Sequence, residues 1–220
     1  SKLNLLIPTR GVLAVVGPSG AGKTTLISII LGLVRPQSGA LKVNDVEITS
    51  SNLRNWHDCL GYVPQQISII DATVMENIAF GVNSNEIDVS RVKEVARLAC
   101  IDKAIEQLPD GYMSRAGERG ARFSGGQQQR IGIARALYHN AQVLVFDEAT
   151  SGLDMQTEHS IMCMLKGLAD SRSVIIISHS SESLKFADVV VKVQNGQIVQ
   201  TKLPSNKKLI IWLKRQQTEI

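Results

Sequence analysis

The sequence has few cysteines and no long apolar run. Cys59, Cys100 and Cys163 are the only three cysteines in 220 residues, and none belongs to a C-x-x-C pair. This scattered, odd set excludes a disulfide framework and a zinc knuckle, so we expect reduced cysteines at packing positions. The histidines show no metal-ligand spacing. The longest nearly apolar stretch, residues 26–34, is about half the length of a membrane span, and no signal peptide opens the chain, so the polypeptide is not expected to cross a bilayer.

Charge is balanced over most of the chain. There are 24 Lys and Arg residues against 20 Asp and Glu residues, a net charge of +4. The surplus lies in residues 202–220, which contain Lys202, Lys207, Lys208, Lys214 and Arg215 but only Glu219 as an acid. A neutral body lacks the broad positive face of a duplex-binding protein, so no nucleic-acid partner is expected. We expect residues 202–220 to be a basic tail, either solvated or in contact with a membrane surface or a partner.

Short apolar runs predict a mostly parallel β-sheet. Residues 12–16 form a β-branched run between two glycines, which is typical of a parallel strand buried on both faces. Similar runs return at 143–146, 174–177, 189–193 and 198–199. A hairpin that turns at Asn44 and Asp45 would add a small antiparallel part.

Between these runs, residues from about 67 to 140 show helix and loop patterns. Thr73 and Glu76 fit a capping box at the start of a helix. Apolar residues recur on one face of residues 91–100, and Asp102 is expected to be the N-cap of the next helix. The sequence therefore predicts an α/β fold interrupted by a helical insert.

The strongest motif is a glycine-rich phosphate-binding loop. Residues 17–24, Gly-Pro-Ser-Gly-Ala-Gly-Lys-Thr, match G-x-x-x-x-G-K-[ST] completely, between the first strand and a helix expected over 26–33. The glycines let backbone N–H groups curl around phosphate oxygens at the helix start. Lys23 would reach the β- and γ-phosphates, and the Thr24 hydroxyl would face Mg²⁺. The alternative is a glycine-rich turn without a ligand.

Two carboxylates follow the strand at 143–146. In open α/β sheets ligands bind at the carboxyl ends of the strands, the edge that also carries the phosphate loop. Asp147 is therefore predicted to hold Mg²⁺, directly or through water, and Glu148 to polarise an attacking water. The alternative is a solvated strand end, where acidic residues are also common. The phosphate loop earlier in the chain favours the functional interpretation.

A second anion-binding element lies at residues 124–127, Ser-Gly-Gly-Gln, and an apolar helix follows through Leu137. Ser124 and Gln127 also satisfy a capping box, so an ordinary helix start is the alternative. The Ser-Gly-Gly backbone is suited to phosphate oxygens. Two such sites in one chain indicate that two copies share nucleotides head-to-tail.

Together these motifs make the chain similar to the nucleotide-binding domain of an ATP-binding cassette (ABC) transporter, from Leu3 to about Val199. The resemblance implies a P-loop NTPase (RecA-like) fold with ATP and Mg²⁺ as cofactors. The expected organisation is an ATP-binding domain over 1–201, with a core at about 1–65 and 141–201 and a helical subdomain at about 66–140, and then the tail 202–220.

The resemblance also implies roles for individual residues. The ATP phosphates would contact Gly17, Pro18, Ser19, Gly20, Ala21, Gly22, Lys23, Thr24 and Thr25. Gln65 resembles the glutamine that touches Mg²⁺ and relays to the membrane domain, so Thr24, Gln65 and Asp147 would hold the metal, partly through water. The ATP of the opposite subunit would contact Ser124, Gly125, Gly126, Gln127 and Asp154. His179 resembles the switch histidine on the γ-phosphate, and the implied catalytic residues are Glu148, His179, Lys23 and Gln65.

Two segments, 71–78 and 117–120, resemble the exporter branch of the family. Phe123, Gly152 and Ser180 depart from the usual residues without removing an assigned functional group. The aromatic residue that the family stacks on adenine is absent before the phosphate loop. We therefore expect a soluble fragment of a longer exporter whose transmembrane domain is fused N-terminally.

The leading hypothesis is an ATP-hydrolysing motor domain at the cytoplasmic face of a membrane. It would form a homodimer or heterodimer on ATP binding and drive export of a lipid, lipid-linked sugar, drug or peptide. The alternative is a soluble P-loop ATPase that is not coupled to a membrane. A small-molecule kinase would not need residues 124–127, a cohesin-type head would carry a long coiled coil before them, and a non-hydrolysing domain would be expected to lack Glu148 or His179.

Overall fold

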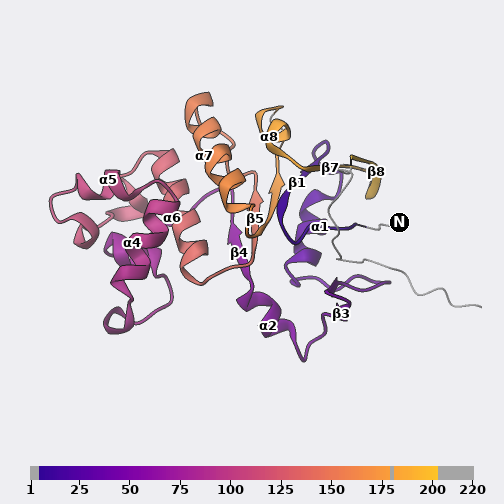
Figure 1. Cartoon of the computed structure of the whole chain (residues 1–220), viewed down its shortest axis with the longest axis horizontal. Helices are drawn as coiled ribbons and strands as arrows, with labels where there is room; N and C mark the ends of the chain where they lie inside the picture. Colours follow the sequence, from indigo (N-terminus) through magenta and orange to yellow (C-terminus); the bar gives the residue numbers. More distant parts are fainter. Residues whose placement is uncertain (1–4, 179–180, 203–220) are drawn as a thin grey trace, which may run out of the picture.

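The computed structural model describes residues 5–178 and 181–202, and its centre is a six-stranded sheet (Figure 1). The strands lie in the order β4-β5-β6-β1-β7-β8. Their bounds are β1 Gly11–Val16, β4 Leu60–Val63, β5 Val143–Asp147, β6 Ser173–Ile177, β7 Val189–Gln194 and β8 Gln197–Lys202. Only the β7–β8 pair is antiparallel. A separate antiparallel hairpin joins β2 (Lys42–Val43) to β3 (Val46–Glu47), which confirms the predicted turn.

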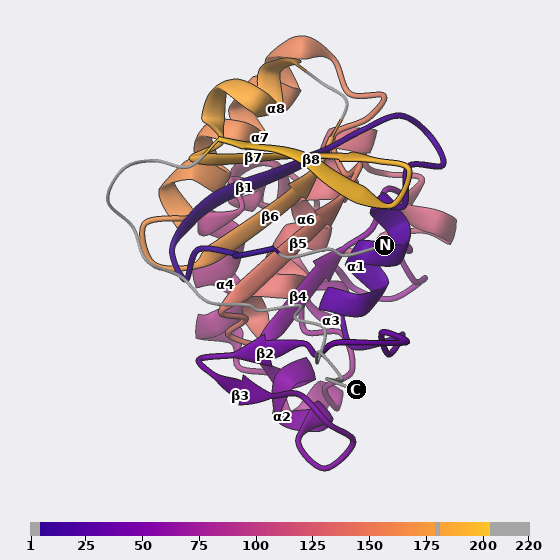
Figure 2. The same ribbon diagram turned by 90° about the vertical axis from the view of Figure 1, so that its right-hand side faces the viewer.

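Helices cover both faces of the sheet. Successive strand residues point to opposite sides, and the apolar residues on both sides are buried under helices. One face packs on α1 (Lys23–Ile30) and α2 (Leu53–Asp58), where Val145 and Ile175 are fully buried. The other face packs on α6 (Gly125–Tyr138) and α7 (Met155–Leu168). Figure 2 shows α1 on the near side of the sheet and α6 behind it. The last helix, α8, spans Ser181–Phe186.

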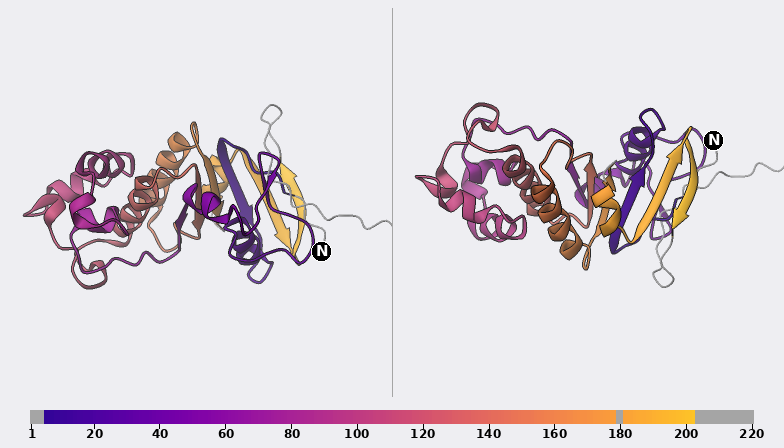
Figure 3. Two further views of the ribbon diagram at one scale, coloured as in Figure 1. Left: turned by 90° about the horizontal axis from the view of Figure 1, so that it is seen from below. Right: turned by 90° about the horizontal axis from the view of Figure 1, so that it is seen from above.

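The elements between β4 and β5 are helical and gather at one end of the elongated molecule (Figure 3). Besides α6 they are α3 (Val74–Ile78), α4 (Val89–Leu98), α5 (Asp102–Glu106) and the short 3-10 helices η1 (Ser84–Glu86), η2 (Gly111–Met113) and η3 (Glu118–Gly120). Their apolar side chains continue the core of the α6–α7 face. No helix in residues 5–178 and 181–202 combines the length and apolar character that a membrane crossing needs.

Two predicted helix boundaries are wrong. The helix expected over 26–33 is α1, which begins at Lys23 and ends before Gly32, where the backbone has φ +72° and an added Cβ would lie 2.6 Å from Leu53 Cδ1. Asp102 is the first residue of α5 and not its N-cap. The chain already turns at Ile101, whose carbonyl accepts the first intrahelical bond from Ile105 N at 3.1 Å.

Two further predictions need correction. All three cysteines are free, as expected, but Cys100 and Cys163 are exposed and do not fill the core. Lys202, placed in the tail by the sequence, is the last residue of β8. The remainder of the predicted tail, 203–220, lies outside the described residues.

Candidate functional site

The phosphate loop connects the carboxyl end of β1 to the start of α1. Gly22, at φ +102°, immediately precedes α1, so the first backbone N–H groups of the helix face the loop. The Lys23 side chain is buried, and its Nζ donates to the carbonyls of Gly17 at 2.8 Å and Pro18 at 3.0 Å. The ammonium group therefore lies against the backbone of the phosphate loop, while Thr24 is exposed on the first helical turn.

The turn after β7 supports this loop. A Cβ added at Gly17 would lie 2.2 Å from the Val193 carbonyl oxygen, so only glycine fits there without displacing backbone. Gly196 N donates to the Ala21 carbonyl at 2.9 Å and its Cα would lie 3.5 Å from a Cβ at Gly22. Sequence reasoning missed this support, since the contact joins residues at opposite ends of the chain.

The sheet register brings the second predicted element to the same edge. Ile177 pairs with Asp147 on one side and with Val15 on the other, so the three residues form one row across β5, β6 and β1. Two strand spacings separate the ends of that row, about 10 Å. Asp147 therefore lies beside the phosphate loop that follows β1. Glu148, the next residue, donates its backbone N–H to the Ile177 carbonyl at 3.1 Å.

Tyr62 on the neighbouring β4 and Gln65, two residues after the end of β4, contact this edge of the sheet. The Tyr62 hydroxyl donates to Asp147 Oδ2 at 3.2 Å. Burial, followed by the charge and hydrogen bond of Asp147, raises the pKa of Tyr62 to about 12, so the hydroxyl stays protonated. Gln65 Nε2 donates to Ser151 Oγ at 3.0 Å, which places the predicted glutamine beside the segment that follows Glu148. Tyr62 was not predicted from sequence, where nothing pairs it with Asp147.

These groups fit a magnesium nucleotide. The loop offers backbone N–H donors and a buried ammonium group to phosphates, while Thr24, Gln65 and Asp147 offer only oxygen ligands, the type that Mg²⁺ prefers. Within residues 5–178 and 181–202, no group of three His, Cys, Asp and Glu side chains could hold a metal ion alone.

The second predicted anion-binding element begins α6. Ser124 Oγ accepts from Gln127 N at 3.3 Å, and Gln127 Oε1 accepts from Ser124 N at 2.9 Å, so the capping box is confirmed. A Cβ at Gly126 would lie 2.6 Å from Thr157 Cγ2, so the first turn of α6 packs closely on α7. Among the described residues, no hydrogen bond joins 124–127 to the phosphate loop.

The remaining predicted site residues have different outcomes. Asp154 is the N-cap of α7, where its Oδ1 accepts from Thr157 N at 2.9 Å, and hydrogen bonds from Thr157 lower the pKa of Asp154. Thr157 in turn packs against Gly126, so the helix start that Asp154 caps adjoins the start of α6. Pro18, Ser19, Gly20 and Thr25 are exposed on the loop and the first turn of α1. His179 lies outside the described residues.

A mostly parallel sheet with a phosphate loop after β1 and adjacent carboxylates at the end of β5 defines a P-loop nucleotide-binding domain. The family model described as "ABC transporter" matches residues 1–151. The chain therefore belongs to the ABC transporter family and is an ATPase domain of the ABC type.

Known proteins of this family resemble the chain over most of its length. An "ATP-dependent lipid A-core flippase" of Saccharophagus degradans is 40% identical over 198 residues, which cover 90% of this chain and 33% of that protein. The chloroplastic "ABC transporter B family member 29" of Arabidopsis thaliana is 38% identical over 196 residues, which cover 89% of this chain and 31% of that protein. The structure of a bacterial Atm1-family ABC exporter with ATP bound matches with a TM-score of 0.81 at 32% identity. The match covers 91% of this chain and 35% of the exporter chain. The chain thus spans about a third of the length of these relatives.

Proposed function

We propose that the chain is the ATP-hydrolysing motor domain of an exporter and that two copies, identical or related, close head-to-tail around two ATP. The observation that carries the proposal is the separation of two anion-binding helix starts. Lys23 begins α1, which packs on one face of the sheet, whereas Ser124 caps α6, which packs on the opposite face. A nucleotide site that uses both helix starts would take one from each copy.

Within one copy, the loop and Lys23 would bind the phosphates. On binding, the Lys23 ammonium would exchange the neutral carbonyls of Gly17 and Pro18 for charged phosphate oxygens, which form stronger hydrogen bonds. Thr24, Gln65 and Asp147 would hold Mg²⁺, which when bound neutralises charge on the β- and γ-phosphates. The Tyr62 hydroxyl would orient Asp147 for that contact.

Glu148 would hold the attacking water at the edge of the sheet, with His179 assigned to the γ-phosphate from the family resemblance. On the partner's nucleotide, Ser124 and the backbone N–H groups of Gly125 and Gly126 would act directly. Gln127 and Asp154 would contribute through the helix starts that they cap.

For coupling, we propose that residues 66–140 form a helical subdomain on the core and that a transmembrane domain of the same transporter docks where the two meet. A cavity of about 520 Å³ opens there beside β4 and α6, and the half-exposed aromatic rings of Tyr62 and Phe80 line it. The relatives named above support an exporter on the cytoplasmic face of a membrane. A lipid or lipid-linked sugar is the proposed cargo, ahead of a drug or peptide.

A mixing experiment tests the shared site. Lys23→Ala removes the phosphate contact, and Ser124→Arg puts a bulky charge where the partner's nucleotide would lie, so each variant alone should be inactive. In an equal mixture, half of the dimers combine one Ser124 with the other chain's Lys23, which restores up to about a quarter of the unaltered ATPase rate by mass action. Phosphate release measures this rate.

The matched control replaces the Ser124→Arg chain by the double variant Lys23→Ala/Ser124→Arg, which leaves no intact phosphate loop and should stay inactive. Full activity of Ser124→Arg alone would show that one chain builds the whole site.

A further inference from the structure

The segment after Gln65 lies against α6 through two neighbouring positions of that helix. A Cβ added at Gly132 would lie 2.5 Å from Ile67 Cδ1, so the missing side chain lets Ile67 pack onto the helix backbone. Three residues further along α6, Arg135 Nη1 donates to the Ser68 carbonyl at 3.0 Å. Residues three apart share a helix face. One face of α6 therefore holds Ile67 and Ser68 together.

Every nitrogen of the Arg135 guanidinium donates a hydrogen bond to Ser68 or Asn77. Besides Ser68, its Nε donates to the Asn77 carbonyl at 2.9 Å and its Nη2 to Asn77 Oδ1 at 3.3 Å. The guanidinium carbon lies 4.8 Å from the centre of the Phe80 ring. Burial lowers the pKa of Arg135, but the group stays a cation, and carbonyl dipoles and a ring face compensate its charge. The ion pairs of the described residues do not include Arg135.

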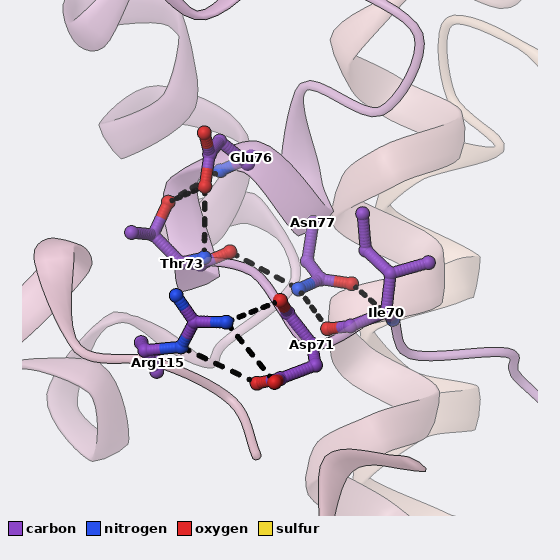
Figure 4. Close-up of polar contacts among 6 residues, drawn as sticks. All are labelled: Ile70, Asp71, Thr73, Glu76, Asn77 and Arg115. Atoms are coloured by element: carbon purple, nitrogen blue, oxygen red, sulfur yellow. Dashed lines mark hydrogen bonds and ion pairs between the residues drawn. The ribbon is translucent and has the colours of Figure 1, made fainter. Parts of the chain in front are cut away.

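Asn77, which is fully buried, connects Arg135 to the backbone of Ile70 and Thr73. Its Oδ1 accepts from Ile70 N, and its Nδ2 donates to the carbonyls of Ile70 and Thr73, all at 3.0 Å (Figure 4). The same Oδ1 also accepts from Arg135 Nη2. An amide side chain has two acceptor positions and two donors, so its capacity is fully used. Such a satisfied buried network holds the backbone of residues 70–73 in one position.

The opposite side of this segment contacts the chain that leads to Ser124. A Cβ at Gly120 would lie 3.0 Å from Ile69 Cβ, and Arg115 Nη2 donates to the Asp71 carbonyl at 2.8 Å (Figure 4). Residues 67–73 are thus held between α3, α6 and the 115–120 turn.

We propose that Arg135 is a positioning residue that fixes Gln65, at one end of this segment, relative to Ser124 at the start of α6. The inference rests on the proposed function, because it concerns two parts of the ATPase machinery that act on different nucleotides of a dimer. Arg135 contacts Ser68, Asn77 and Phe80, none of which belongs to the phosphate loop. Loss of the Arg135 hydrogen bonds should therefore leave ATP binding at Lys23 intact. It should lower turnover, because turnover requires Gln65 and Ser124 to be held in fixed positions relative to each other.

Arg135→Lys tests this, with Arg91→Lys as the matched control. Arg91 of α4 also donates to backbone carbonyls at the same end of α6, to Leu137 at 2.8 Å and Tyr138 at 3.5 Å, but does not touch residues 67–73. In the 220-residue chain without nucleotide, hydrogen exchange of amides 66–73 should rise about tenfold in Arg135→Lys and stay unchanged in Arg91→Lys. The MgATP dissociation constant, measured by calorimetry, should stay within about twofold of the unaltered chain, while kcat falls about tenfold only in Arg135→Lys.

Equal exchange of amides 66–73 in both variants would overturn the inference whatever the ATPase result. Equal losses of kcat would overturn it too, because a general loosening of α6 gives that result. Should the unaltered chain bind no MgATP, the proposed function fails, whereas the exchange measurement still decides the inference. If Arg135→Lys does not fold, Gly132→Ala serves instead, since its Cβ displaces Ile67 and alanine favours the helix.

Discussion

At the scale of single residues, Glu148 combines an assigned catalytic role with an unfavourable backbone conformation. Its φ of 50° lies in the left-handed region, which costs a residue with a side chain roughly 1 kcal/mol or more. Its N–H bonds the Ile177 carbonyl and its carbonyl accepts from Ser151 N at 2.9 Å, so the surrounding chain enforces this conformation. The left-handed conformation turns the backbone out of the line of β5 directly after the strand ends.

Glu148→Gln should separate ATP binding from hydrolysis. The amide keeps the shape and one acceptor oxygen of the carboxylate but removes the charge that polarises water. We expect MgATP affinity within about twofold of the unaltered chain and a loss of turnover of about 10²-fold or more. Calorimetry and phosphate release measure the two quantities, and Glu94→Gln on the surface of α4 is the control. Turnover at the unaltered rate would remove Glu148 from its assigned role.

Single residues differ in how far sequence could predict them. Lys23 and Ser124 were predictable because local patterns of glycine and hydroxyl residues define the loop and the helix start. The structure places Lys23 at the first position of α1 and Ser124 at the N-cap of α6, and the contacts of both residues with ATP stay predictions. Tyr62 and Arg135 were not predictable, because their partners depend on strand register and helix packing between segments far apart in sequence.

At the scale of elements, α3 depends on its N-terminal capping box for both stability and pH response. Glu76 accepts hydrogen bonds from Thr73 N at 2.9 Å, Thr73 Oγ1 at 2.7 Å and Ser84 Oγ at 2.8 Å. The Thr73 bonds are the main cause that lowers the pKa of Glu76 from its ordinary value of 4.5. The carboxylate therefore stabilises the folded chain above pH 4.5, and this contribution is lost as the pH falls through the lowered pKa.

Glu76→Gln should thus lower the free energy of unfolding at pH 7, and the difference from the unaltered chain should shrink as the pH approaches 3. Urea unfolding at several pH values measures this difference. Thr73→Ser keeps both cap bonds and should behave like the unaltered chain. A difference that stays constant from pH 7 to 3 would show that the carboxylate charge is not involved.

Element types were easier to predict than element ends. Buried parallel strands consist of continuous β-branched runs, so the runs at 143–146 and 174–177 matched β5 and β6 within one residue. The end of α1 at Gly32 and the start of α5 at Ile101 are decided by tertiary contacts and by the preceding turn, which local patterns do not contain.

At the scale of the whole molecule, the shared nucleotide site predicts that activity depends on association. While dimers are scarce, the ATPase rate per volume should rise with about the square of protein concentration, by mass action. Steady-state assays over a dilution series, with sedimentation to determine the oligomeric state, measure this order. Ser124→Arg should abolish the second-order part. A strictly linear dependence, where sedimentation shows only monomers, would mean that each chain carries a complete site.

The position of β1 in the sheet also constrains how the chain is made. β1 lies between β6 and β7, so both of its neighbours are synthesised more than 150 residues after it. At ribosomal rates of about 5–20 residues per second, this apolar strand waits roughly ten seconds or longer for its partners. During that interval it is a candidate for chaperone capture or aggregation. The phosphate loop, near the start of the chain, is therefore among the last parts of the protein to acquire its native surroundings.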